Sequence, residues 1–454
     1  MSFAITSISP IDGRYSKQTE SLKPVFSEFG LIKNRVKVEI LWLIALSNDK
    51  EIKELPKFSK QALKYLNQLF LDFSEKDAKA VKEIEKKTNH DVKAIEYWLR
   101  SQLKKKKLNK VNEFIHFSLT SEDVNNLAYA LMLKEGLTTT IVPSIKKISA
   151  KLKANSKKFV ALPMLSRTHG QTASPTTLGK EFANINYRIE RQIIQLKNQE
   201  ILGKINGAVG NFNAHVSAYP KKNWPAFSKS FISSLKLTYN PMTTQIEPHD
   251  FIAEIFQNVS RINTILIDLN RDIWGYISLG YFKQKVIKGE IGSSTMPHKV
   301  NPIDFENSEG NLGLSNAILN HLAEKLPLSR WQRDLTDSTV LRNIGVGFSY
   351  GLIAYNSCIK GLNKLEVNKS IIHEELNQSW EVLAEPIQTV MRKNGIENSY
   401  EKLKDITRGK GKISSDKIHH FIKNLKIPKD DKAYLLKLTP QSYIGVAQQL
   451  VKKN

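Results

Sequence analysis

The sequence predicts an all-α protein of three helical domains, with a bundle of long helices at its centre. In residues 250–281, apolar side chains recur at steps of three and four and mark one continuous helix face. The same pattern runs through 174–202, through about 120–159, and through about 304–326. No alternation of strands with helices accompanies these stretches. Helices of this length need long partner surfaces, so a bundle and the association of several subunits are expected.

The chain divides into three predicted helical domains where the pattern changes length. Residues 1–112 contain shorter helical stretches and form a predicted N-terminal domain. Residues 113–366 hold the long helices, with Gly136 and Pro143 as expected kinks in one of them. Residues 367–454 return to shorter stretches, which predicts a small C-terminal domain. A chain of 454 residues is long enough for this division.

Composition argues against a membrane protein and against a disulfide-stabilised one. Hydrophobic residues make up 41% of the chain, but no apolar run approaches the roughly 20 residues that span a bilayer. The N-terminal MSFAITSISPIDGRY lacks a basic stretch followed by an apolar one, so no signal peptide is expected. Cys358 is the only cysteine, and no intrachain disulfide can form. A cytoplasmic protein is therefore predicted.

The formal net charge of +24 admits three explanations. Nucleic-acid binding is one, but the basic residues are dispersed among acidic ones, and the only dense run is Lys104–Lys107. No zinc-finger, RNP or basic-zipper pattern accompanies that run. A lysine-rich composition is the favoured explanation, and steering of a small anionic substrate is the third. We therefore expect no nucleic-acid partner.

Histidine is scarce, and three of the ten histidines lie in unusually polar surroundings. They are His90 in KTNHDVKA, His169 in LSRTHGQTASP and His298 in GSSTMPHKVNP. Each could be simply structural or solvated. His169 is the strongest candidate for proton transfer, because it is expected in a loop between Pro163 and Pro175 and histidine exchanges protons near neutral pH.

Two further segments have both a structural and a functional interpretation. Thr120 and Ser121 precede a predicted helix and suit an N-cap, with Asp123 as a capping-box partner, but a helix N-terminus also attracts anions. A metal site is poorly supported, because the adjacent His419 and His420 are the only close histidine pair. No G-x-S-x-G motif supports a serine hydrolase.

The loop at residues 292–302, GSSTMPHKVNP, separates two of the long helical stretches. A serine on a glycine-preceded loop can be delivered to a substrate carbon, provided that its proton is removed and its alkoxide stabilised. Lys299 supplies a cation and Asn301 an amide. Both suit a substrate carboxylate whose negative charge grows in the transition state. The alternative is a plain interhelix linker.

GSSTMPHKVNP closely resembles the signature loop of the fumarase/aspartase superfamily, whose members eliminate fumarate from succinyl-type substrates. His298 followed by Lys299 resembles the adenylosuccinate lyase family within it. SPIDGRY near the N-terminus, TNHDV at 88–92, SRTHGQ at 166–171 and RDLTDSTVLRN at 333–343 resemble the bacterial form of that family. The resemblance extends over nearly the whole chain. Thr172 departs from it, because relatives often have proline there.

This resemblance implies a β-elimination that breaks a C–N bond and needs no cofactor and no metal. The substrates would be adenylosuccinate, giving AMP and fumarate, and the succinylated aminoimidazole carboxamide ribotide. Ser293 would be the general base, with Ser294 as the alternative, and His169 the general acid. The residues implied in substrate binding are Arg14, Tyr15, Asn89, His90, Asp91, Thr120, Ser121, Gln245, Lys299, Asn301, Asn307, Arg333, Ser338 and Arg342.

Roles within this set follow from the same resemblance. Lys299 and Asn301 would hold the succinyl carboxylates, and Arg14 and Arg342 would be among the contacts of the nucleotide phosphate, since arginine donates in pairs. The site would be assembled from three subunits of a homotetramer. Two rivals remain: another lyase of the superfamily, such as an argininosuccinate lyase, and a basic helical protein that binds nucleic acid.

Overall fold

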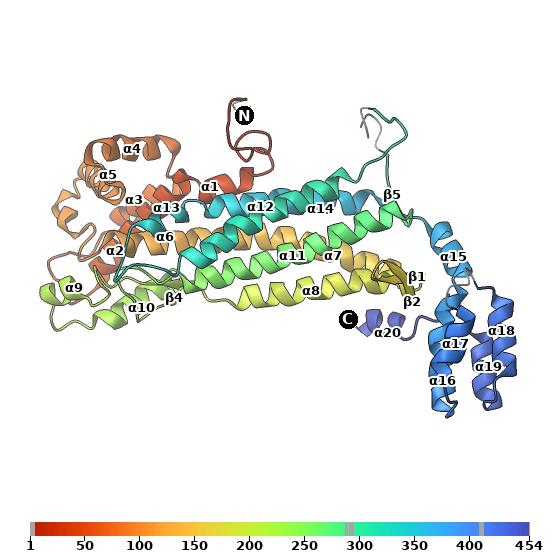
Figure 1. The fold of residues 1–454 in the computed structure, drawn as a ribbon. Helices are drawn as coiled ribbons and strands as arrows, with labels where there is room; N and C mark the ends of the chain where they lie inside the picture. The colour runs from red at the N-terminus through yellow and green to blue at the C-terminus, as the bar shows by residue number, and fades with distance from the viewer. Residues whose placement is uncertain (1–4, 287–288, 290–294, 408–412, 454) are drawn as a thin grey trace. The chain divides into compact units, whose positions relative to one another are not determined.

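The predicted all-α class is confirmed by the computed structural model, which describes residues 5–286, 289, 295–407 and 413–453 (Figure 1). The α-helices of the first half of the chain are α1 (Lys23–Phe26), α2 (Glu28–Asn48), α3 (Lys60–Leu71), α4 (Glu75–Thr88), α5 (Asp91–Lys105), α6 (Ser121–Gly136), α7 (Val142–Lys158), α8 (Leu178–Asn198), α9 (Asn213–Ala218) and α10 (Trp224–Ser234). Those of the second half are α11 (Asp250–Ser278), α12 (Ile303–Lys325), α13 (Thr336–Leu341), α14 (Ile344–Lys364), α15 (Lys369–Gln378), α16 (Ala384–Lys393), α17 (Ser399–Thr407), α18 (Ser415–Asn424), α19 (Lys429–Lys437) and α20 (Ala447–Lys453).

Short elements complete the described part of the chain. Three are 3₁₀ turns, η1 (Glu20–Leu22), η2 (Asn109–Phe114) and η4 (Trp380–Leu383), and η3 (Leu137–Ile141) is a π-helical turn. The strands form two-stranded sheets. The pairs are β1 (Pro163–Thr168) antiparallel to β2 (Gln171–Thr177), β3 (Leu202–Gly203) parallel to β4 (Thr238–Tyr239), and β5 (Phe282–Gln284) antiparallel to β6 (Leu365–Val367).

The long helices form where the apolar period predicts them. The stretch at 250–281 is α11, and that at 304–326 is α12. The disturbance expected near Gly136 and Pro143 is the π-helical turn η3, which separates α6 from α7. Proline has no backbone N–H to donate one turn back, so the regular ladder is interrupted there.

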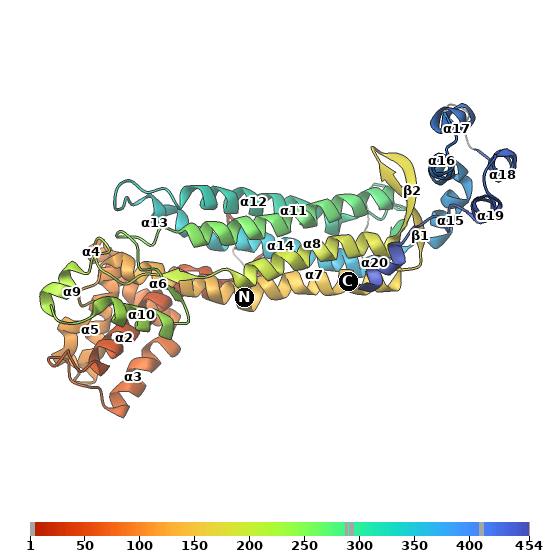
Figure 2. The ribbon, with the colours of Figure 1, turned by 90° about the horizontal axis from the view of Figure 1, so that it is seen from below.

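The prediction for residues 174–202 is wrong at its N-terminal end. Helix α8 begins only at Leu178, and the four residues before it belong to β2. Pro175 disfavours helix at the preceding residue, and Thr176 and Thr177 are β-branched and suit the strand. The hairpin of β1 and β2 leads directly into α8 (Figure 2).

The described chain divides into two compact units that do not follow the sequence order. The first comprises Met1–Ile145, Gln192–Thr264 and Gly310–Asn356. The second comprises Lys146–Arg191, Ile265–Glu309 and Ser357–Asn454. Several long helices contribute to both units. The three consecutive domains expected from the sequence stay a prediction.

In the first unit, α2 packs against α6 and the short helices α3 and α5. Trp42 of α2 stacks edge-on against Phe227 and Phe231 of α10, and α6 is buried on most of its sides. Elsewhere in this unit, Asn263 of α11 donates to Ser315 of α12 over 3.1 Å and accepts from the Tyr355 hydroxyl of α14 over 2.6 Å. These buried hydrogen bonds fix the register of the three helices.

The second unit has its own apolar core. Ile148 and Leu152 of α7 are fully buried, as is Leu266 of α11. Phe182 of α8 stacks on Phe282 of β5, with ring centroids 6.2 Å apart. The end of α11, the start of β5 and the hairpin-bearing helix α8 are therefore held in one core. In the described part of the chain, no helix is both long and apolar enough to cross a membrane.

Candidate active site

The start of α5 brings two of the predicted binding residues into one motif. His90 is the N-cap residue, and its Nδ1 accepts from the backbone N–H of Lys93 over 3.1 Å. Asp91 is the first helical residue, and its side chain turns toward two guanidinium groups. Asn89, just before the cap, ends α4 in the left-handed conformation with φ 50°. These three consecutive residues thus form the junction between the end of α4 and the start of α5.

Asp91 and Arg342, two of the predicted substrate residues, form an ion pair. Arg342 Nη2 lies 3.3 Å from Asp91 Oδ2, and Arg342 Nη1 lies 2.5 Å from Glu28 Oε2. Arg35 Nη2 lies 2.7 Å from the same oxygen of Asp91. Burial opposes ionisation of Asp91, but the charge and hydrogen bond of Arg35, the backbone N–H of Val92 and the charge of Arg342 together outweigh it, and the pKa of Asp91 is lowered.

A chain of hydrogen bonds extends from Arg35 to Arg333 and Gln245. Arg35 Nε donates to Asn125 Oδ1 over 2.8 Å, and Asn125 Nδ2 donates to Glu122 Oε1 over 2.6 Å. Arg333 then donates to Glu122 over 2.8 Å and to Gln245 Oε1 over 3.1 Å. The first unit therefore links four of the predicted substrate residues, Asp91, Gln245, Arg333 and Arg342, through buried polar side chains of α2 and α6.

The N-cap interpretation of Thr120 and Ser121 is confirmed. Helix α6 begins at Ser121, and the backbone N–H of Thr120 donates to Asp123 Oδ2 over 2.9 Å. Asp123 does more than close the capping box. It lies 2.9 Å from Nζ of the fully buried Lys204 and also accepts from the backbone of Asn206. A buried ion pair thus fixes the end of α6 that carries Thr120 and Ser121, and the anion-site interpretation stays a prediction.

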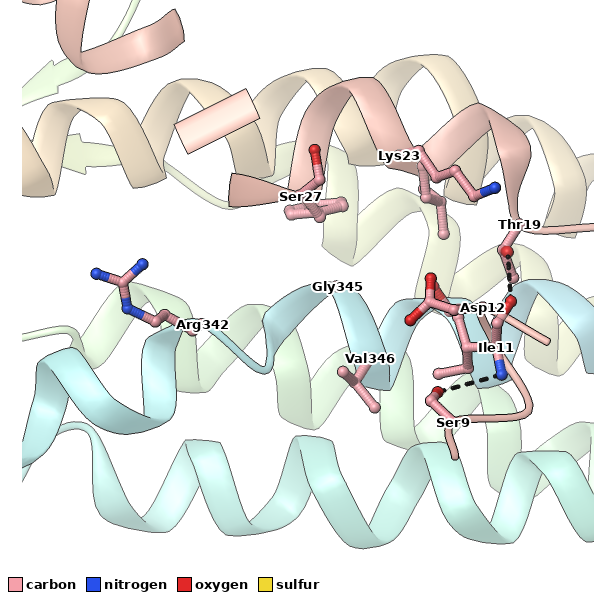
Figure 3. A pocket seen from close by; sticks show the side chains of 12 residues that line it. Ser9, Ile11, Asp12, Thr19, Lys23, Ser27, Arg342, Gly345 and Val346 are labelled. Atoms are coloured by element: carbon pink, nitrogen blue, oxygen red, sulfur yellow. Dashed lines mark hydrogen bonds between the residues drawn. The ribbon is translucent and has the colours of Figure 1, made fainter. Parts of the chain in front are cut away.

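A cavity of about 200 Å³ lies beside Arg342 in the first unit (Figure 3). Polar side chains from three segments line it, among them Ser9, Asp12, Thr19, Lys23 and Ser27. Hydrogen bonds within the N-terminal turn shape one wall, where Thr19 donates to the carbonyl of Ile11 over 3.2 Å. Two cations, Lys23 and Arg342, and one carboxylate, Asp12, line this cavity. Lys23 is paired with Glu20, and Arg342 with Glu28 and Asp91.

The remaining predicted residues of the first unit lie on short turns. Arg14 is exposed, and its guanidinium lies over the ring of Tyr15, 5.9 Å from the centroid. Both belong to the turn that supplies Ser9 and Asp12 to the cavity wall. Ser338 is half-buried on α13, and its backbone N–H donates to Asp337 over 2.6 Å.

His169 lies in the second unit. The sequence predicts a loop between Pro163 and Pro175, but these residues form a β-hairpin, and His169 is in its turn. The turn between β1 and β2 is only His169–Gly170, with Thr168 paired to Gln171. Both turn residues have positive φ, 54° and 74°, which is typical of the tight type I′ turn that matches strand twist. The side chain of His169 is exposed at the tip. A short hairpin, held by its turn geometry, therefore presents the candidate general acid.

The signature loop contributes its described part to the second unit. Lys299 is exposed, and its backbone N–H donates to the carbonyl of Met296 over 3.1 Å. Asn301 is half-buried just before α12, and Asn307 on α12 accepts from the Ser357 hydroxyl over 2.7 Å. Ser293 and Ser294 lie outside the described residues. Their roles stay predictions.

Sequence reasoning missed the charged residues that support the site from behind. Arg35, Glu122 and Lys204 are all buried, with relative exposures of 1%, 2% and 0%. Arg35 did carry a signal, because it lies on the apolar face of α2 between Leu31 and Val38, where a lone charge demands a buried partner. Glu122 and Lys204 carried none. Among the described residues, no three or more His, Cys, Asp or Glu side chains group as metal ligands would.

Comparison with known proteins defines the class first. A family model described as Lyase matches residues 13–317, and one described as Adenylosuccinate lyase C-terminal matches residues 329–444. The protein is thus a lyase of the fumarase/aspartase type, in agreement with its helical fold.

Full-length relatives narrow the class to one family. An adenylosuccinate lyase of Vibrio cholerae serotype O1 is 58% identical over 99% of both chains. Those of Haemophilus influenzae and Escherichia coli strain K12 are also 58% identical, over 99% of this chain and 98% of theirs. The chain belongs to the adenylosuccinate lyase family.

Solved structures with low sequence identity share the fold. A fumarate lyase from Mesorhizobium sp. BNC1 aligns with a TM-score of 0.76 and 16% identity, over 96% of this chain and 97% of that one. A 3-carboxy-cis,cis-muconate lactonizing enzyme from Pseudomonas putida aligns with a TM-score of 0.74 and 18% identity, over 96% of each chain. The helical architecture is therefore common to enzymes of differing names.

Proposed function

We propose that this protein cleaves adenylosuccinate to AMP and fumarate, and the succinylated aminoimidazole carboxamide ribotide to its carboxamide ribotide and fumarate. The observation that carries the proposal is 58% identity with adenylosuccinate lyases over 99% of this chain. The match of the C-terminal family model to residues 329–444 supports the same substrate class.

The reaction breaks one C–H bond and one C–N bond and forms one C=C bond. Ser293, having lost its own proton and acting as an alkoxide stabilised by the nearby positive charge of Lys299, takes the proton from the carbon next to a carboxylate and so becomes a neutral hydroxyl, and the electron pair first spreads into that carboxylate. The pair then forms the double bond as the C–N bond breaks, and His169 protonates the departing nitrogen. Lys299 and Asn301 stabilise the growing charge on the carboxylate. Atoms and charges balance with side chains alone, so no cofactor or metal is proposed.

The nucleotide end of the substrate binds in the first unit. The cavity of about 200 Å³ beside Arg342 and Lys23 is smaller than the roughly 300 Å³ or more of a typical ligand pocket. It therefore suits the phosphate group and not the whole nucleotide. Arg14, Tyr15, Arg333 and Ser338 complete the nucleotide contacts. Asn89, His90, Asp91, Thr120, Ser121, Gln245 and Asn307 complete the substrate set.

The working protein is a homotetramer in the cytoplasm. Large apolar side chains remain exposed on the long helices, including Tyr187 and Ile194 of α8, Trp274 of α11 and Leu314 of α12, each at least half exposed. Such surfaces on long helices mark subunit interfaces. The exposed tip of the β1–β2 hairpin then supplies His169 to a site whose Ser293 comes from another subunit. The free, buried thiol of Cys358 fits a reducing compartment.

The direct test uses proton NMR to measure the fumarate that the purified protein releases from each substrate. Adenylosuccinate and the succinylated ribotide should each give fumarate, and argininosuccinate at the same concentration should give none. Ser293→Ala should lower kcat by at least about 10³-fold. Fumarate from argininosuccinate alone would identify a different lyase. A protein that released none, yet bound DNA with micromolar, salt-sensitive affinity, would support the nucleic-acid alternative.

A further inference from the structure

The carboxylate of Glu375 on α15 joins two separate segments of the second unit. Its Oε1 accepts a hydrogen bond from Arg167 Nη2 and is ion-paired with it. Its Oε2 accepts a hydrogen bond from the hydroxyl of Tyr281. The arginine and tyrosine are 114 positions apart by their numbers, and neither is among the residues implied in substrate binding. One side chain thus bridges two otherwise separate elements.

Each bridged residue lies next to an element that carries a proposed catalytic group. Arg167 is on β1, two residues before His169. Tyr281 lies directly before β5, the strand that begins the segment leading to the signature loop. The backbone carbonyl of Tyr281 also accepts from Asn368 N–H over 2.8 Å, and β5 pairs with β6. The base of that segment is therefore anchored to the C-terminal part of the unit.

The hairpin depends on contacts of this kind. A bulge between Leu165 and Ser166 shifts its register, and residues 168–172 beyond it are exposed. An isolated two-stranded hairpin is marginally stable in water. The other strand is held in a similar way, because Glu385 of α16 accepts hydrogen bonds from Ser174 of β2 and, over 2.9 Å, from Tyr443.

The side chains that meet at Glu375 are largely shielded from water. The side chains of Arg167 and Glu375 are 23% and 30% exposed, and Tyr281 is buried. Arg167 Nε is buried without a hydrogen-bond partner in the described structure. Glu375 is the carboxylate that pairs with the Arg167 guanidinium, and loss of that carboxylate leaves a largely buried charge without its ion-pair partner.

We propose that Glu375 is a positioning residue that holds the His169 hairpin and the base of the signature-loop segment in catalytic geometry. Glu375 does not touch the substrate. It acts through Arg167 on the strand that ends at His169, and through Tyr281 on the strand that begins the other segment. The catalytic effect of Glu375 rests on the proposed function, whereas its contacts with Arg167 and Tyr281 are a property of the structure.

Three variants of the full-length protein test the proposal. Glu375→Gln removes the charge with little change in shape, and Tyr281→Phe removes only the hydroxyl. Asp268→Asn is the matched control, because Asp268 lies 2.6 Å from Arg188 in another partly exposed ion pair of the same unit. We expect kcat to fall roughly tenfold in the first two variants with KM within about twofold, the pattern of lost positioning. The control should keep both constants, and its melting temperature sets the structural baseline.

Amide hydrogen exchange gives a readout that does not depend on activity. Residues 165–173 should exchange faster in Glu375→Gln than in Asp268→Asn, and the double variant Arg167→Gln/Glu375→Gln should lose no more kcat than the worse single one. The proposal would be overturned if Glu375→Gln and Tyr281→Phe both kept the hydrogen-exchange rates and the kcat of the wild-type protein. Wild-type protein inactive on adenylosuccinate would overturn the proposed function instead, and the exchange result would still decide whether Glu375 holds the hairpin.

Discussion

Asp91 and the buried Arg35 form a close ion pair, with Arg35 Nη2 2.7 Å from Asp91 Oδ2. Arg342 approaches the same oxygen at 3.3 Å and also pairs with Glu28. Arg35 is fixed by burial, whereas the side chain of Arg342 is 38% exposed and lines the cavity. Asp91 therefore has one permanent cation and one that an incoming phosphate can attract. If Arg342 binds the substrate phosphate as we propose, it would have to leave Asp91 and Glu28 to do so, and substrate entry would be coupled to this network.

Arg342→Lys should weaken use of the nucleotide substrate by about 1.5–3 kcal/mol in kcat/KM, the scale of a charged hydrogen bond. Lysine keeps the charge but loses the paired donors that suit phosphate. A substrate analogue without the 5′-phosphate should be cleaved almost equally by both proteins, because it has no such contact to lose. Steady-state kinetics on both substrates measure this difference. Equal losses on the two would assign Arg342 to the fold through Glu28 and Asp91.

Replacement of Arg35 should act on stability before it acts on chemistry. Arg35→Met fills a similar volume but leaves Asp91 and Asn125 without their buried partner, so the free energy of unfolding should fall by about 3 kcal/mol. Urea unfolding followed by circular dichroism measures it. Lys86→Gln is the control, because Lys86 and Glu83 form an exposed pair with 69% and 65% side-chain exposure. That change should stay within about 0.5 kcal/mol. Equal effects of the two would remove Arg35 from its central place in the network.

The periodic features of the fold could be predicted from the sequence, since a 3.6-residue period reports which face is buried. Helix α11 follows from ten apolar positions along one face, and α12 follows from the same pattern. The β1–β2 hairpin could not be derived in this way. Its six- and seven-residue strands carry proline and small polar residues, and the hairpin is held by Glu375 and Glu385, which are distant in sequence.

For the candidate site too, features encoded by local motifs could be predicted, and contacts between distant residues could not. The cap at Thr120 could be predicted from its local motif, because helix caps are encoded within four residues. The cap formed by His90 was not predicted. Asp91 and Arg342, both implied in substrate binding by the resemblance, lie 3.3 Å apart, and their roles stay predictions. The supporting charges were missed, because Arg35 and Asn125 are 90 residues apart and only the packing of α2 on α6 brings them together. The pairing of Glu375 with Arg167 spans 208 residues and could not be read from either segment alone.

Shared sites between subunits predict complementation. His169→Gln and Ser293→Ala should each be inactive, but unfolding and refolding them together should restore some activity, because mixed assemblies would contain sites with neither substitution. With random mixing into tetramers, up to about a quarter of the wild-type activity is expected where two residues come from different chains. Sedimentation should give a tetramer for both variants and for the mixture. An active monomer, or a mixture that stayed inactive despite mixed tetramers, would contradict the shared site.

A buried histidine–carboxylate pair predicts how stability depends on pH. His116 Nδ1 lies 2.6 Å from Glu39 Oε1, and its backbone N–H donates to Glu39 Oε2 over 3.1 Å, just before the segment that leads to Thr120. Burial opposes the charged imidazole, but the charge and hydrogen bond of Glu39, with the charges of Glu96 and Asp123, together outweigh it, and the pKa of His116 is raised in the folded protein. The pair fixes this segment against α2.

The pH window follows from the direction of that shift. Because the pKa is raised on folding, the stabilisation is fully present below the unfolded value of about 6.5 and is lost as the pH rises through the folded value. Glu39→Gln removes the charge that raises it, so the gap in melting temperature between wild type and Glu39→Gln should be widest near pH 6 and narrow toward about pH 9. Scanning calorimetry over this range measures the gap. A gap that widened with rising pH would mean that His116 is neutral in the folded protein.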